Sequence, residues 1–119
     1  ISQNADYAAQ VKLDREQVRS KNRESLQAII DNETLSETEK QGAVDAMAKL
    51  TQNAQMEADA EMLLEAKGFE DVVVSVSDSC CDIVVGKEDV SDEKRAQIED
   101  VIKRKTNINA ENIVITTID

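Results

Sequence analysis

Hydrophobic positions recur at helical spacing along the first half of the chain and at alternate positions in the second half. Residues 5–31 contain no Gly or Pro and carry a thin apolar stripe, which predicts a long first helix. Ser36, with Glu39 three positions later, forms a capping-box signature for a second helix that extends to Lys67. Gly68 follows at the position where a left-handed C-terminal cap is expected.

The hydrophobic period then changes from about 3.6 to 2. Residues 72–77 and 80–85 alternate in this way around a short polar turn, which predicts a β-hairpin. Ser91 is placed to cap a third helix, with acidic residues in the first turn and basic residues in the last. Residues 112–118 supply a final strand.

These elements predict an α+β fold with the order α-α-β-β-α-β, in which two long N-terminal helices precede a small three-stranded sheet packed by helices. The second strand, third helix and third strand form a β-α-β crossover, which is nearly always right-handed. The simplest sheet has the second strand in the middle, antiparallel to the first and parallel to the third. The first and third strands are then edges, where another chain could pair.

The first predicted helix has few apolar residues with which to pack, namely Tyr7, Val11 and Val18 over its first 20 or so positions. Helices gain most of their stability from packing, so we expect something else to cover this one. We therefore divide the chain into a partner-facing N-terminal extension helix, residues 1–35, and an α-β-β-α-β domain, residues 36–119.

Charge is segregated between the two long helices. Residues 12–24 hold five basic and three acidic side chains, whereas residues 31–65 hold two basic and nine acidic ones. One interpretation is an antiparallel helical hairpin whose halves attract each other. The other is a docking face for a partner, and the two are compatible.

The composition of the 119 residues excludes most chemistry. The absence of His rules out Ser-His-Asp and Cys-His machinery, and the three Gly residues cannot form a phosphate-binding loop. The net charge of −11 argues against nucleic acid, whose phosphates are bound by Lys and Arg. We predict a non-enzymatic domain with no catalytic residues, no cofactor and no metal. So acidic a chain should also repel its copies and stay monomeric until a partner or anchor concentrates it.

Two clusters could still carry chemistry. Cys80 and Cys81 are adjacent on a predicted strand and so point to opposite faces, and Cys81 is expected to be a small core residue. Redox or cation sensing around this pair is a weaker alternative. The acidic stretch of the second helix is interpreted as a solvated face, with a divalent cation site as the less favoured alternative; it comprises Glu57, Asp59, Glu61 and Glu65.

Three segments resemble the stage III sporulation protein AH family of endospore-forming bacilli. They are N-A-D-Y-A-A-Q-V-K-L-D-R-E-Q-V-R (Asn4 to Arg19), A-E-M-L-L-E-A-K-G-F (Ala60 to Phe69) and V-V-V-S-V-S-D-S-C-C-D-I-V-V (Val72 to Val85). The resemblance implies a domain between the mother-cell and forespore membranes that binds the extracytoplasmic domain of stage II sporulation protein Q. It also implies an N-terminal membrane anchor, which we expect upstream because this chain starts at Ile1 rather than Met.

The same resemblance implies a core similar to the ring-building motif of type III secretion and flagellar inner-membrane ring proteins. Self-association into a ring or channel linking the two cells is therefore expected. An alternative is a KH-like RNA-binding domain, which shares the α-β-β-α-β order but requires a G-x-x-G clamp and a basic groove that this sequence lacks.

The leading hypothesis from the sequence is a structural adhesion domain that docks a partner through its N-terminal helices, a sheet edge, or both. The candidate protein-binding residues are Val11, Arg15, Val18 and Arg19 on the first helix, and Val114, Ile115 and Thr116 on the third strand.

Overall fold

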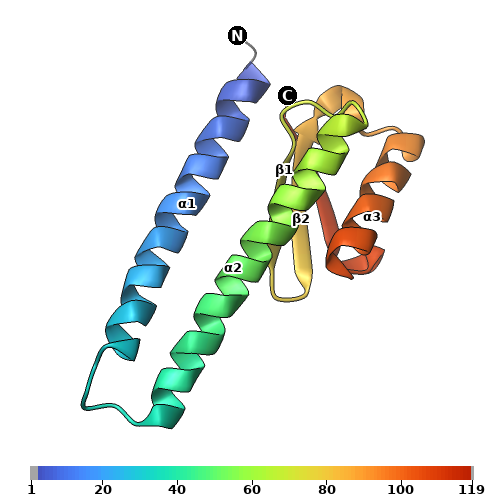
Figure 1. Ribbon diagram of the computed structural model, residues 1–119. Coiled ribbons are helices and arrows are strands. Elements are labelled where there is room, and N and C mark those ends of the chain that lie inside the picture. Colours follow the sequence, from blue (N-terminus) through green and yellow to red (C-terminus); the bar gives the residue numbers. More distant parts are fainter. Residues whose placement is uncertain (1–2, 119) are drawn as a thin grey trace.

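A computed structural model describes residues 3–118 and shows a helical hairpin packed along a small sheet (Figure 1). The elements are α1 (Gln3–Ile30), α2 (Glu37–Ala66), β1 (Val73–Ser77), β2 (Cys80–Gly86), α3 (Asp92–Thr106) and β3 (Ile113–Ile118). Short 3-10 turns, Lys87–Asp89 and Ala110–Asn112, precede α3 and β3. The α-α-β-β-α-β order predicted from the sequence is confirmed.

The helix ends follow from local side-chain chemistry. The Ser36 hydroxyl accepts a hydrogen bond of 3.2 Å from the backbone N–H of Glu39, which satisfies one of the free donors at the start of α2. Gly68, just beyond α2, has φ +102°, a conformation that side chains with a Cβ rarely adopt. Ser91 caps α3 in the same way as Ser36 caps α2, and left-handed Asn107 ends α3.

The sheet has the predicted order β1-β2-β3, with β2 antiparallel to β1 and parallel to β3. Ile83 sits at its centre, opposite Val74 on one side and Ile115 on the other. Asp78, with φ 49°, turns the hairpin between β1 and β2. The register places alternate residues of all three strands on one face.

The hydrophobic core lies between that face and two helices. It includes Leu64 of α2, Ile83 of β2 and Ile98 of α3, all fully buried. Because β1, β2 and β3 contribute residues of a single parity to this cluster, α2 and α3 must cover the same face of the sheet. Within the described part of the chain, this core contains no residue of α1.

Candidate protein-binding site

Side chains close the outer edge of β1. The Glu61 carboxylate accepts a hydrogen bond of 2.8 Å from the backbone N–H of Val74, and the Glu57 carboxylate accepts one of 2.7 Å from that of Val76. Arg15 donates to the carbonyl of Val74 at 2.7 Å. These backbone N–H and C=O groups of β1 are the ones with which an added strand would have to form hydrogen bonds. Strand addition at β1 is therefore blocked while these contacts persist.

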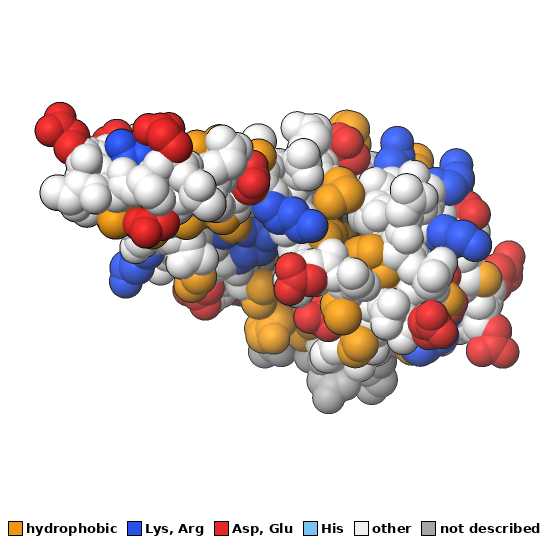
Figure 2. Space-filling view, turned by 90° about the horizontal axis from the view of Figure 1, so that it is seen from below, with side chains coloured by type: hydrophobic (Ala, Val, Ile, Leu, Met, Phe, Trp, Pro, Cys, Tyr) orange, Lys and Arg blue, Asp and Glu red, His pale blue; other side chains and the backbone are white. Residues whose placement is uncertain are grey.

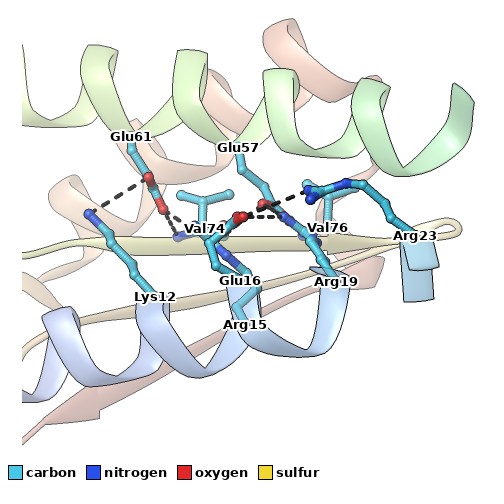
Figure 3. Close-up of polar contacts among 9 residues, drawn as sticks. All are labelled: Lys12, Arg15, Glu16, Arg19, Arg23, Glu57, Glu61, Val74 and Val76. Atoms are coloured by element: carbon cyan, nitrogen blue, oxygen red, sulfur yellow. Dashed lines mark hydrogen bonds and ion pairs between the residues drawn. The ribbon is translucent and has the colours of Figure 1, made fainter. Parts of the chain in front are cut away.

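The same two carboxylates bind the basic side chains of α1 (Figure 3). Both terminal nitrogens of Arg19 donate hydrogen bonds of 2.5 Å to the two carboxylate oxygens of Glu57. This is the bidentate geometry that a guanidinium favours with a carboxylate. Nη1 of Arg15 lies 3.4 Å from Oε1 of Glu57, and Nζ of Lys12 lies 3.7 Å from Oε1 of Glu61. The hydrogen bond with Glu57 is the main cause that raises the pKa of Arg19, against the opposing effect of burial.

The interpretation of the acidic stretch as a solvated face is wrong for two of its four residues. Glu57 is 1% exposed and Glu61 is 9% exposed, whereas Glu65 lies in water. Burial is possible because α1 supplies cations and β1 supplies backbone donors. The sequence contained a signal, because carboxylates four apart on α2 match arginines four apart on α1, Arg15 and Arg19. The attracting helical hairpin, one of the two interpretations of the charge pattern, is present.

The candidate residues on α1 occupy different environments. Arg15 and Arg19 face α2 and β1 in the ion-pair network, and Val11 is half-buried. Val18 is 59% exposed, although it lies on the predicted apolar stripe. Of these four residues, Val18 therefore offers the most apolar surface to another molecule.

The candidate residues on β3 lie at the opposite edge of the sheet from α1 (Figure 1). Val114 is 55% exposed and Thr116 is exposed, both on the face away from α2 and α3. Ile115 points the other way and packs against the core. The structure therefore separates the candidate residues into two surfaces, one on each side of the sheet.

A groove of about 400 Å³ runs beside Val18, between α1, α2 and the hairpin turn. Leu50 and Asn22 form part of its wall and also line the adjoining hollow toward the closed end of the helical hairpin. Two buried polar atoms at the groove, Oδ1 of Asn53 and Nε of Arg15, have no hydrogen-bond partner within the described structure. Asn53 is absent from the residues predicted from the sequence, because Gln52 and Gln55 beside it are also amides and nothing in the sequence distinguishes this one.

Figure 2 shows the molecule from the closed end of the helical hairpin, with hydrophobic and basic side chains side by side near the middle of this face. Acidic side chains lie around its margins and also next to these groups near the middle. Apolar groups next to arginines are typical of surfaces that bind another protein, more than of pockets that bind a small molecule.

The two cysteines occupy the predicted environments, Cys80 exposed and Cys81 buried, and both are free thiols. Burial is the largest cause that raises the pKa of Cys81, to about 12, and the charges of Asp82 and Glu57 add to it. A protonated, enclosed thiol is a poor nucleophile. The structure thus places the second cysteine in the core.

We expect Ellman's reagent at pH 8 to titrate one thiol per native chain and two in denaturant, and Cys80→Ser to abolish the native reaction. Because the folded pKa of Cys81 is raised, the unfolded chain loses that proton first. The contribution of Cys81 to stability should therefore fall as the pH rises from about 9 toward 12. Equal native rates for both thiols would contradict this placement.

Neither a membrane span nor a metal-binding cluster is found between residues 3 and 118. No helix there combines the length and hydropathy needed to cross a bilayer. No three Asp, Glu or Cys side chains in that part of the chain are grouped so as to hold an ion.

The fold and the site define a class: a small helix-on-sheet domain with a charged helical hairpin and two separate candidate surfaces. Residues 1–115 match the family described as SpoIIIAH-like protein, so the chain belongs to that family. The family resemblance seen in the sequence is thereby confirmed.

Two known proteins are similar to this chain. Stage III sporulation protein AH of Bacillus subtilis (strain 168) is 31% identical over 100 residues, which are 84% of this chain and 46% of that protein. The chain therefore spans about half the length of this curated relative. A chain in a structure entitled "Structure of the SpoIIQ-SpoIIIAH pore forming complex" matches with a TM-score of 0.81 and 29% identity, over 92% of this chain and 94% of that one.

Proposed function

We propose that this domain binds the extracytoplasmic domain of a stage II sporulation protein Q and so helps to bridge the mother-cell and forespore membranes. The observation that carries this proposal is the similarity, over 92% of the chain, to a protein solved in a SpoIIQ–SpoIIIAH complex. The domain would lie in the space between the two membranes, attached by an N-terminal anchor upstream of this sequence. Its role is structural adhesion, and its assembly into a ring or channel belongs to the same proposal.

The groove beside Val18 is the surface that we assign to the partner. It offers the exposed aliphatic side chain of Val18, and two polar atoms buried in its wall, Oδ1 of Asn53 and Nε of Arg15, have no hydrogen-bond partner in the described structure. Unpaired buried polar atoms are rare in folded proteins and cost about 1–3 kcal/mol each, so this wall is a locally unfavourable part of the isolated domain. On this proposal Arg19 holds α1 in position through Glu57 and does not itself contact the partner.

The edge of β3 is the second candidate surface. The β1 edge is occupied by side chains of α1 and α2, so β3 is the edge left for strand pairing, and Val114 is the most exposed of its apolar residues. Because β3 and α1 lie at opposite edges of the sheet, the two surfaces could act together. A closed ring requires two different surfaces on each copy.

The test measures binding of the purified domain to the soluble domain of protein Q from the same organism, by calorimetry and light scattering. Val18→Asp should weaken the complex at least tenfold, a loss of about 1.4 kcal/mol or more, because a charge would enter an apolar contact. Leu13→Asp is the matched control, since Leu13 is 52% exposed on another side of α1.

The outcomes separate the surfaces. If Val114→Asp weakens binding and Val18→Asp behaves like Leu13→Asp, the contact lies at β3 and the groove assignment is wrong. If the unaltered domain forms no complex at tens of micromolar, the proposed function fails for this domain.

A further inference from the structure

Charged side chains, with few apolar ones, attach α1 to the rest of the domain. The described part of α1 adds no residue to the hydrophobic core, and its buried side chains are those of Ala8 and Arg19. Lys12, Arg15 and Arg19 make ion pairs and hydrogen bonds to α2 and β1. Removing α1 would therefore break polar contacts and leave the core cluster intact.

The surface under α1 is a carboxylate cradle, made by Glu57 and Glu61 together with the edge backbone of Val74 and Val76. Without α1 the two carboxylates would be uncovered, would keep their hydrogen bonds to the backbone N–H groups of Val74 and Val76, and would have no countercharge. The cradle thus attracts a helix with cations three and four positions apart on one face, the pattern of Lys12, Arg15 and Arg19.

Charge indicates which helix could replace α1. The chain carries a net charge of −11, and residues 31–65 hold nine acidic and two basic side chains, so most of one copy repels most of another. Residues 12–24, with five basic and three acidic side chains, are the segment that attracts the cradle of a second copy.

The connection between α1 and α2 is short and exposed. Residues 31–34 are exposed, and their order depends on local contacts such as the hydrogen bond of 2.9 Å from Thr34 N–H to Asn32 Oδ1. Only this segment has to change for α1 to leave its own cradle and enter another. Exchange of an identical element conserves the native contacts and is a low-cost route to association.

We propose that the carboxylate cradle accepts α1 from a second copy of this chain, so that copies at high local concentration exchange their first helices. The Arg19–Glu57 pair then forms between chains, and the groove beside Val18 is rebuilt from two chains. This inference concerns self-association and does not depend on the binding of protein Q.

A charge-exchange experiment tests the proposal. Arg19→Glu in one chain and Glu57→Lys in another each place like charges together within their own chain. Mixed, the two variants can satisfy both contacts only by exchanging α1. We expect each alone to be a monomer with an unprotected α1 in hydrogen exchange, and the mixture to show twice the monomer mass in native mass spectrometry, with α1 protected.

Two controls use the same charge changes elsewhere. A mixture of Lys21→Glu and Glu65→Lys, both at exposed positions outside the cradle, should stay monomeric with α1 protected. The double variant Arg19→Glu with Glu57→Lys should restore the contact within one chain and also be monomeric. A cradle-variant mixture that remains monomeric, with α1 unprotected, would overturn the proposal.

A second measurement avoids substitutions in case a single reversal prevents folding. Isotope-labelled and unlabelled wild-type chains are unfolded, mixed and refolded together at millimolar concentration. We expect a mixed-mass dimer whose α1 is as protected as in the monomer. A refolded sample that contains only monomers would contradict helix exchange.

Discussion

Replacing Glu57 with alanine is expected to lower the free energy of unfolding by about 3–5 kcal/mol, the usual effect of breaking a buried ion pair from one side. Glu57 is 1% exposed and accepts from both terminal nitrogens of Arg19 and from the backbone N–H of Val76. The substitution leaves an enclosed guanidinium and an edge donor without an acceptor. Urea unfolding followed by circular dichroism measures the loss.

The matched control for this substitution is Glu65→Ala, two helical turns further along α2. Glu65 is exposed, so its loss should change the free energy of unfolding by no more than about 0.5 kcal/mol. Glu57→Gln should fall between the two, because the amide oxygen still accepts a hydrogen bond while the charge is lost. If Glu57→Ala costs no more than Glu65→Ala, the buried network does not form in solution.

The size of this effect explains why an acidic helix can lie against a sheet edge. The carboxylates of Glu57 and Glu61 replace the carbonyl groups of a neighbouring strand, because each accepts a hydrogen bond from a backbone N–H that β1 directs outward. The guanidinium of Arg15 supplies the complementary donor to the carbonyl of Val74. One cluster of charges therefore fixes α1, joins α2 to β1 and leaves β3 as the edge open to pairing.

Local chemistry determined the parts of the fold that the sequence predicts well. Ser36, Gly68 and Ser91 mark helix ends through contacts within a few residues, and the change of period at residue 72 marks the start of the strands. Cys81 could be assigned to the core because alternation along a strand fixes the face on which each side chain lies. These inferences require no knowledge of the tertiary arrangement.

The parts that escaped prediction depend on how α1 crosses α2. Acidic residues are rarely buried unless paired, so a carboxylate-rich stretch is reasonably interpreted as solvated. The partner that buries Glu57 is Arg19, 38 positions away in the sequence. The unpaired amide of Asn53 is likewise a consequence of the hairpin register, which sets what stands opposite it. The spacing of the charges indicates how α1 aligns with α2 only after the two helices are known to pack antiparallel to each other.

Truncating Leu64 to alanine is expected to lower the free energy of unfolding by about 2–5 kcal/mol, the range for large-to-small changes in a core. Leu64 is fully buried where α2 meets the sheet and belongs to the same cluster as Phe69 and Ile98. The loss combines transfer of the missing atoms to water with the cavity that they leave. Unfolding in urea again supplies the measurement, and its slope shows whether the transition stays cooperative.

Met62→Ala provides the comparison on the same helix, because Met62 is 67% exposed and should change stability by no more than about 0.5 kcal/mol. Hydrogen exchange also shows which elements of the domain are destabilised, which the free energy of unfolding does not show. Leu64 belongs to the core that α2, α3 and the sheet share, and α1 contributes no described residue to that core. Its truncation should therefore speed exchange in α2, α3 and β2 together, whereas Glu57→Ala should speed exchange first in α1. Equal effects of Leu64→Ala and Met62→Ala would contradict the packing of α2 on the sheet.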